Sequence, residues 1–159
     1  MSTPLILLHG DDGFGLDLAL RSFAQSVDAT DRIEIVPDRT PDEGALDRAR
    51  LGAGTMGMFG AHLTVLRQPL KAAGRSTAAA NRLLALVDEL PAGAALALLE
   101  ERPSRDIGKP PALLKRIGEA VKARGGRVEE YPAPRRGDLR GWITVHAART
   151  SIATPSRAA

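Results

Sequence analysis

Short, mainly apolar runs recur along the chain and predict strands. Leu5–Leu8, Leu63–Leu66 and Ala94–Leu99 each hold consecutive apolar side chains, the pattern of strands that are buried on both faces of a parallel sheet. Arg32–Val36 and Arg127–Tyr131 have mixed patterns that predict two further strands.

Between these runs, apolar residues recur at spacings of three and four, which predicts helices with one apolar face. The second helix is expected to open at Thr40, with Pro41 in its first turn and Glu43 reaching back to the cap. Strand and helix alternate about five times, which predicts an α/β fold: three layers around a mostly parallel, five-stranded sheet. The expected apolar helix faces are Leu16/Leu20/Phe23/Val27, Leu83/Leu84/Val87/Leu90, Leu113/Leu114/Ile117/Val121 and Leu139/Trp142/Ile143/His146.

Composition narrows the function classes. The chain has 159 residues, which suits one domain. It has no cysteine, so thiolate metal sites and cysteine nucleophiles are excluded. Aromatic residues make up 3%, too few for a base-stacking platform. No apolar run approaches ~18 residues and no basic region precedes the first one, so neither a membrane span nor a signal peptide is expected.

The charge is divided unevenly along the chain. The net charge is +3, but residues 1–101 carry −5 and residues 102–159 carry +8. This basic half is explained either by an arginine-rich proteome or by a surface that meets DNA or an acidic partner. Charge alone favours the first explanation, because it constrains association and solubility rather than fold.

The loop after the first strand has the spacing of a phosphate-binding loop. Gly10–Gly15 fits G-x-x-x-x-G between a strand and a helix, but Leu16 and Asp17 stand where Lys and Ser/Thr are required. Nearby carboxylates would also repel a polyphosphate, by about 1–4 kcal/mol for each contact at ~4 Å. We therefore expect a vestigial phosphate loop that binds no nucleotide, made of Gly10, Asp11, Asp12, Gly13 and Gly15.

Two other segments imitate nucleotide motifs. Gly74–Thr77 resembles the end of a phosphate loop, but the first glycine of that motif would fall at Pro69, which has no N–H to donate. Glu100 and Glu101 resemble the acidic end of a Mg²⁺-holding strand. Without a phosphate loop beside them, we interpret both as solvated loop charges.

No other catalytic or metal site is expected. His9, His62 and His146 are far apart in sequence and lack metal-ligand spacing, and no serine lies in G-x-S-x-G. His146 is interpreted as a packed or partly exposed side chain rather than a base. The sequence therefore predicts no cofactor, no metal and no catalysis by this chain.

A glycine-rich loop at 52–60 carries large apolar side chains, Met56, Met58 and Phe59. Either Phe59 folds beneath the loop and covers the sheet edge, or the loop presents apolar side chains to a partner's pocket. Small clusters of this kind can dominate an interface, and methionine adapts to a partner's shape.

Several segments, taken in order, resemble the N-terminal domain of the delta subunit of bacterial DNA polymerase III, the clamp-loader wrench. Each motif is weak alone, but together they extend over nearly the whole chain. The segments are Leu7-Leu8-His9-Gly10-Asp11-Asp12, Met58-Phe59-Gly60 before Leu63–Arg67, Leu90-Pro91-Ala92-Gly93, and Tyr131-Pro132-Ala133-Pro134 followed by Leu139-x-x-Trp142-Ile143.

The resemblance implies an AAA+-type, RecA-like domain that has lost ATPase chemistry, with Arg67-Gln68 where active relatives carry an acidic pair. The family inserts a Leu-Phe pair into a hydrophobic pocket of the ring-shaped sliding clamp and helps to open the ring. Phe59 matches that Phe, Met58 stands in place of Leu, and Met56 matches an upstream apolar position. A Met-for-Leu change usually costs less than about 1.5 kcal/mol in packed cores.

The implied partners are the sliding clamp (beta subunit), the delta-prime and gamma/tau clamp-loader subunits, and DNA indirectly through the complex. The implied setting is the cytoplasmic, nucleoid-associated replisome, within a holoenzyme whose polymerase is a nucleotidyltransferase. Family members continue into a helical lid and a collar. We therefore expect residues 1–148 to form the AAA+-like domain and 149–159 to be a tail or the start of a truncated lid.

Two alternatives remain open at this point. The first is a small nucleotide-binding or phosphotransfer domain that uses Gly10–Gly15 or Gly74–Thr77. The second is a DNA-binding domain that uses the basic C-terminal part, for which the sequence holds no reading motif.

Overall fold

A computed structural model of the chain describes residues 4–55, 61–103, 108–135 and 137–149. Within these ranges it contains five strands and six helices, in strict alternation apart from two helices in succession after the third strand. The strands are β1 Leu5–Gly10, β2 Ala29–Ile35, β3 Ala61–Arg67, β4 Ala95–Glu101 and β5 Arg127–Tyr131. The helices are α1 Gly13–Ser26, α2 Glu43–Gly54, α3 Pro69–Ala73, α4 Thr77–Asp88, α5 Ala112–Ala123 and α6 Leu139–Arg149.

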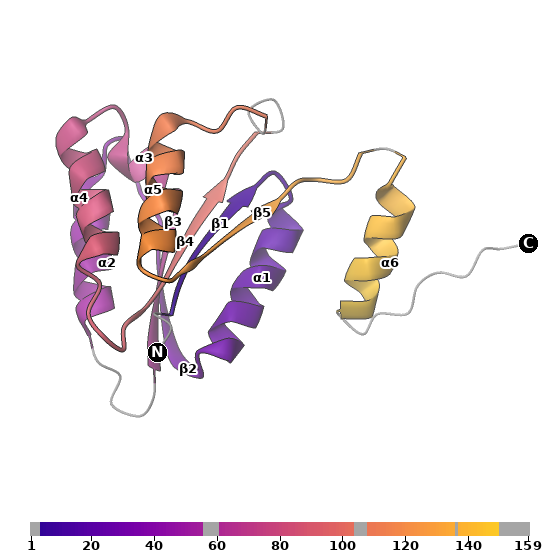
Figure 1. Cartoon of the computed structure of the whole chain (residues 1–159), viewed down its shortest axis with the longest axis horizontal. Coiled ribbons are helices and arrows are strands. Elements are labelled where there is room, and N and C mark those ends of the chain that lie inside the picture. The colour runs from indigo at the N-terminus through magenta and orange to yellow at the C-terminus, as the bar shows by residue number, and fades with distance from the viewer. Residues whose placement is uncertain (1–3, 56–60, 104–107, 136, 150–159) are drawn as a thin grey trace, which may run out of the picture.

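The five strands form one sheet in the order β2-β3-β4-β1-β5, and every described pair is parallel. Helix α1 covers one face of the sheet, and α2 to α5 cover the other (Figure 1). This confirms the predicted α/β architecture of three layers around a parallel sheet.

The centre of the sheet is apolar on both faces, as the short runs predicted. Leu5 and Leu7 point to the α2–α5 side, whereas Ile6 and Leu8 point to the α1 side, and each is at most 1% exposed. Fully burying such a side chain stabilises the fold by about 1.5–3 kcal/mol. No helix within the described ranges is long and apolar enough to cross a membrane.

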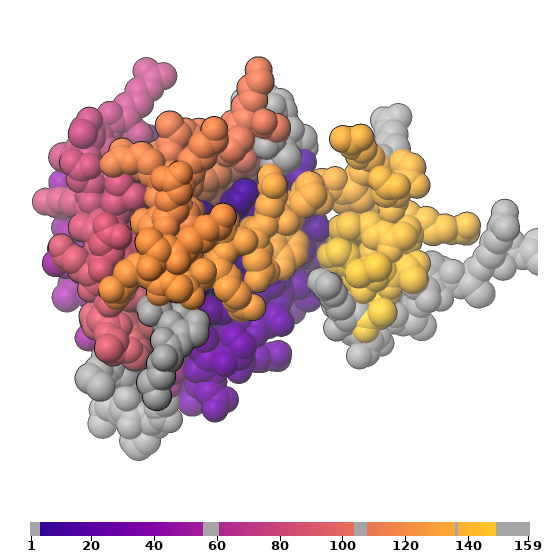
Figure 2. Space-filling view, in the orientation of Figure 1, coloured from indigo at the N-terminus to yellow at the C-terminus, as the bar shows by residue number. Residues whose placement is uncertain are grey.

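Helix α6 lies apart from this layered body. It appears as a separate lobe beside α1 in Figures 1 and 2, reached through the extended connector after β5. Leu139 and Ile143, expected to lie on a buried face, are 47% and 41% exposed. Trp142 and His146, from the same expected face, are partly buried.

The cap predicted for the second helix is wrong. Helix α2 begins at Glu43, and Asp42 is its cap: the Asp42 carboxylate accepts hydrogen bonds from the Ala45 and Asp38 amides, both at 2.9 Å. These backbone donors lower the pKa of Asp42. An aspartate directly before the first turn satisfies the helix amides without Thr40.

The strand order identifies where a ligand would bind in such a sheet. The connection after β1 leads to β2 at one edge, whereas the connection after β4 leads the other way, to β5. Because β1 and β4 are neighbours, their carboxyl ends form a topological switch point, the usual ligand crevice of open parallel sheets. The Arg102 amide, directly after β4, donates to the Gly10 carbonyl at 2.7 Å, so the ends of the two strands meet at this point.

Candidate functional site

The loop between β1 and α1 is packed closely against the end of β5. Gly10 has φ of +149°, and a Cβ there would overlap the Tyr131 carbonyl of β5. The Asp12 amide donates to that same carbonyl at 3.0 Å, and a Cβ at Gly15 would overlap the Asp12 carboxylate. The glycines are therefore required by close packing within the protein, without any phosphate.

The Asp12 carboxylate occupies the N-terminus of α1. Its Oδ1 accepts a hydrogen bond from the Gly15 amide at 2.9 Å, and its Oδ2 accepts one from the Trp142 indole Nε1 at 2.9 Å. Asp12 is only 5% exposed. A helix N-terminus favours one negative charge, and here the protein supplies it from its own side chain.

Three aromatic rings pack together beside this carboxylate. We call the three rings and Asp12 together the α6 clasp (Asp12, Phe14, Trp142, His146). The Trp142 and His146 rings are stacked with centroids 4.1 Å apart, and Phe14 lies 5.8 Å from Trp142 and 5.5 Å from His146. The His146 Nε2 is 3.7 Å from the Asp12 carboxylate. The interpretation of His146 as a packed side chain is confirmed.

Other carboxylates of the crevice are also engaged. Asp11 accepts a hydrogen bond from the Ala133 amide at 2.6 Å. Asp17 pairs with Arg67 at 3.0 Å, and the same guanidinium donates to Glu34 at 2.8 Å. The desolvating effect of burial on Arg67 is outweighed by these two partners, so its pKa is raised and it remains charged. Arg67, which the resemblance places at the position of an acidic pair, thus forms ion pairs that link β3 to β2 and α1.

The interpretation of Glu100 as a solvated loop charge is wrong. Glu100 lies inside β4 rather than in a solvated loop, is 7% exposed, and accepts a hydrogen bond from the Leu70 amide at 2.9 Å. Burial raises the pKa of Glu100 to about 7, although the Leu70 amide and Arg102 act in the opposite direction. Glu101, which ends the strand, is exposed as expected and lies beside Gly13.

The segment Gly74–Thr77, whose sequence resembles the end of a phosphate loop, contains the N-cap of α4. The Ser76 hydroxyl accepts a hydrogen bond from the Ala79 amide at 3.2 Å at the start of α4. Gly74 has φ of +56° in the turn before it. This segment therefore has a complete local explanation, in agreement with the sequence interpretation.

The described histidines do not come together. His62 is buried in β3 beside Asp31, with 3.3 Å between Nδ1 and the carboxylate, and His146 belongs to the α6 clasp. His9 lies on the α5 side of β1, where burial lowers its pKa. Among the residues that the structure describes, no group of three or more His, Asp or Glu side chains could hold a metal ion.

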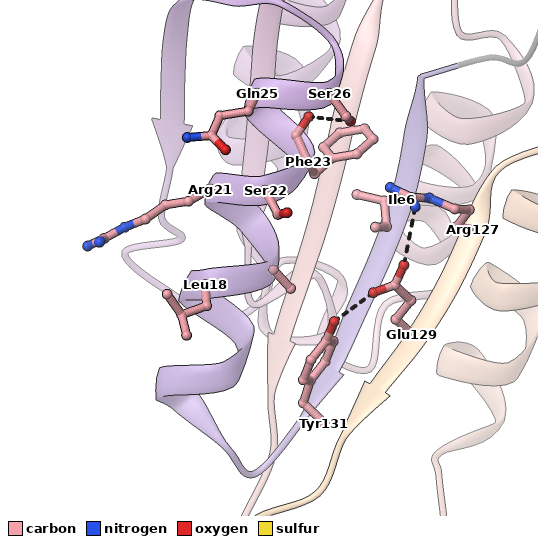
Figure 3. Close-up of a pocket in the computed structure, with 11 residues that line it drawn as sticks. Ile6, Leu18, Arg21, Ser22, Phe23, Gln25, Ser26, Arg127, Glu129 and Tyr131 are labelled. Atoms are coloured by element: carbon pink, nitrogen blue, oxygen red, sulfur yellow. Dashed lines mark hydrogen bonds and ion pairs between the residues drawn. The ribbon is translucent and has the colours of Figure 1, made fainter. Parts of the chain in front are cut away.

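A groove of about 720 Å³ between α1 and β5 is large enough for a small molecule. Its polar groups bond to one another: the Tyr131 hydroxyl donates to Glu129 at 2.7 Å, Arg127 lies 3.7 Å from Glu129, and the Ser26 hydroxyl donates to the Phe23 carbonyl at 2.7 Å (Figure 3). In Figure 3, Arg21 and Gln25 point away from β5. The groove therefore offers few convergent polar groups to a ligand.

The predicted clamp-binding residues Met56, Met58 and Phe59 lie outside the described residues. The structure describes both neighbours of this segment. Helix α2 ends at Gly54, followed by Thr55, whose hydroxyl donates to the Leu51 carbonyl at 2.8 Å. The strand after the segment, β3, begins at Ala61.

Sequence reasoning identified the loop residues but not their partner. The contact between Asp12 and Trp142 joins positions 130 apart in the chain. The sequence signal was weak: a single tryptophan within the last predicted helix. The burial of Glu100 was also missed, because Glu100 and Glu101 were both interpreted as solvated loop charges.

No family model matches this chain, and no curated protein matches it. The crevice therefore has to be interpreted from its own chemistry. Within the described residues it presents a closed helix N-terminus, paired carboxylates and a ring cluster. That arrangement suits a structural or binding module better than phosphate chemistry.

Proposed function

We propose that this chain is a delta-type clamp-loader domain, which binds a sliding clamp and helps to open the ring without ATPase activity of its own. The observation that carries the proposal is the Asp12 carboxylate at the N-terminus of α1, held by the Trp142 indole of α6. A polyphosphate at this helix end would have to displace that carboxylate from the Gly15 amide.

The segments that carry the family resemblance support this proposal by meeting in space. The Asp12 amide donates to the Tyr131 carbonyl, the Ala133 amide donates to Asp11, and Trp142 donates to Asp12. The opening glycine-aspartate motif, the Tyr-Pro segment and the Trp-Ile ending thus form one contact site. A shared contact explains why such distant motifs would occur together.

The AAA+ assignment belongs to the same proposal. A strand, a glycine loop and a helix in direct succession make up the unit from which phosphate loops are built, and here that unit lies at the switch point of the sheet. The domain keeps this backbone while side chains occupy the ligand position. In the proposed assembly, delta-prime and gamma/tau subunits are further partners, and DNA is reached through the complex.

Met58 and Phe59 are proposed as the residues that enter the clamp pocket, with Met56 beside them. They belong to the segment that joins α2 to β3, two elements that are anchored in the core. A pair of large apolar side chains on a short connection between fixed elements is well suited to fill a partner's pocket.

The nucleotide-binding alternative has little support among the described residues. Lys and Ser/Thr are missing from the first loop, and Ser76 of the second caps α4. The DNA-binding alternative still rests on the charge of the C-terminal part alone.

A binding assay against the sliding clamp of the same organism tests the proposal. The parent chain is expected to bind, and Met58→Ala/Phe59→Ala is expected to bind at least about 100-fold more weakly, because paired hot-spot losses exceed about 2 kcal/mol each. Leu139→Ala/Ile143→Ala, an exposed apolar pair on α6, is the matched control. Absence of binding by the parent, or equal binding by the Met58/Phe59 variant, rejects the proposal.

A further inference from the structure

Helix α3 connects the carboxyl end of β4 to the start of α2. It follows β3 directly and lies at the carboxyl edge of the sheet (Figure 1). The Leu70 amide of α3 donates to the Glu100 carboxylate of β4 at 2.9 Å. On the other side of α3, the Ala72 carbonyl accepts a hydrogen bond from the amide of Asp42, the N-cap of α2, at 2.8 Å. A movement of α3 would therefore reach the start of α2 as well as the end of β4.

Little apolar burial holds α3 in this position. It has five residues, its buried members are Pro69, Ala72 and Ala73, and Leu70 is only partly buried. Gln68, which precedes it, has φ of +51°, a left-handed conformation that is unfavourable for a residue with a Cβ. Segments with few buried apolar contacts open locally at a lower free energy than the core does. The polar contacts of α3 therefore decide how firmly it is held.

The carboxyl of Glu100 is an ionisable member of these contacts. It is 7% exposed, and burial raises its pKa to about 7, although the Leu70 amide and Arg102 favour the ionised form. The side chain therefore passes from neutral to charged near neutral pH. An ionised carboxylate is costly where water is excluded. Its charge is better accommodated when the weakly held α3 moves away and admits water.

Several charged groups surround Glu100 on the elements packed beside it. Arg102, directly after β4, favours the ionised carboxyl. His9 is the register partner of Glu100 on β1, and burial lowers its pKa below the ordinary 6.5, so it titrates at lower pH than Glu100. Arg67 of β3 is engaged by carboxylates of β2 and α1, and the Lys71 ammonium of α3 donates to a carbonyl after β2 at 2.9 Å. Beyond His9, the charged groups are Glu130 on β5 and Lys115, Glu119 and Lys122 on α5.

We propose that Glu100 is a proton-dependent contact that controls the docking of α3 on the sheet. With the carboxyl protonated, its carbonyl oxygen accepts from the Leu70 amide, and α3 stays in place. When the carboxyl ionises, it turns toward water, and α3 opens together with its hydrogen bond to Asp42 while the sheet stays folded. The inference is independent of the proposed function.

Amide hydrogen exchange of the full chain, followed residue by residue by NMR at pH 6 and pH 8, tests this proposal. The reporters are the amides of Leu70 and Asp42. The reference is the Leu96 amide, which donates to the Pro4 carbonyl at 2.9 Å at the opposite end of the sheet. Rates are corrected for the intrinsic pH dependence of exchange. A series of low urea concentrations separates local opening, which is insensitive to urea, from global unfolding.

The opening constants of Leu70 and Asp42 are expected to rise about tenfold from pH 6 to pH 8 without dependence on urea, because the carboxyl regains its ordinary pKa when α3 is open. Exchange at Leu96 should instead accelerate with urea. Glu100→Gln should abolish the tenfold rise, whereas Glu101→Gln, at the exposed neighbouring carboxylate, should retain it.

Three results overturn the inference. The first is equal opening of Leu70 and Asp42 at both pH values, and the second is a urea dependence at these amides that matches that of Leu96. The third is a tenfold rise that persists in Glu100→Gln. The first two are measured on the parent chain, so they decide the matter even where Glu100→Gln does not fold.

Discussion

At the residue scale, Asp12 combines two tasks that usually belong to different groups. One carboxylate oxygen caps α1 through the Gly15 amide, and the other holds the Trp142 indole. In a phosphate-binding loop the same helix end would be neutralised by a ligand. Here the neutralising charge is covalently attached, so the site is filled in every molecule without a ligand.

Replacing Asp12 with alanine is expected to lower the free energy of unfolding by about 2 kcal/mol. Loss of a cap contributes about 1 kcal/mol, and an indole N–H left without its partner adds a similar amount. Denaturant titration measures the change. Glu119→Ala, at an exposed position on α5, serves as a control and should stay within about 0.5 kcal/mol of the parent. Equal stability of Asp12→Ala and the parent would contradict the assigned role.

Glu100 predicts a pH dependence of stability. Its pKa is about 7 in the folded protein against an ordinary value of 4.5, so the unfolded chain releases the proton first as the pH rises. Stability should therefore fall between these two pH values, by about 3 kcal/mol for this group. Glu100→Gln removes this titration. Between pH 4 and 8, the unfolding free energy of the variant should rise relative to that of the parent. Curves of free energy against pH that run parallel for the two proteins would contradict the prediction.

The loop residues of the site could be predicted from sequence because their chemistry is local. Gly10–Gly15 has a glycine spacing and lacks lysine, and both facts are visible within eight residues. The Trp142 partner of Asp12 could not be predicted, because its position depends on the connector after β5. The burial of Glu100 could not be predicted, because it depends on the short helix α3, whose Leu70 amide donates to the Glu100 carboxylate.

At the element scale, sequence patterns predicted the strands and long helices because burial dictates their periodicity. The apolar run in β4 and the stripe in α5 both face the core. Helix α3 was not predicted, since its five residues follow Gln68 in the left-handed region and are too few to show a period. The α2 cap was misplaced by two residues because Thr40 and Asp42 offer competing cap chemistry.

Helix α6 is held to the rest of the protein largely by side chains of the α6 clasp. The chain has one tryptophan, so Trp142 fluorescence reports on this contact alone. Phe14→Ala/His146→Ala removes both rings that pack on Trp142, and its emission is expected to shift to the red and become more accessible to iodide. Ile143→Ala, an exposed position on the same helix, should leave both properties unchanged. An unaltered spectrum in the Phe14/His146 variant would show that the rings do not hold α6.

At the scale of the whole molecule, the protein's own side chains occupy the place where open parallel sheets usually bind a ligand. The acidic half of the chain supplies the crevice carboxylates, so the high overall basicity does not favour a polyphosphate there. Calorimetric titration with ATP and Mg²⁺ is expected to give no binding below about 1 mM, because each like-charge contact costs about 1–4 kcal/mol. A sub-millimolar dissociation constant would contradict the closed crevice.

Under the proposed function, this domain binds its partner without nucleotide chemistry. The most direct test is the affinity of the chain for the sliding clamp, measured with and without ATP and Mg²⁺. The account predicts one dissociation constant under both conditions, and its loss in Met58→Ala/Phe59→Ala. Clamp binding that requires ATP, or that survives removal of both side chains, would contradict it.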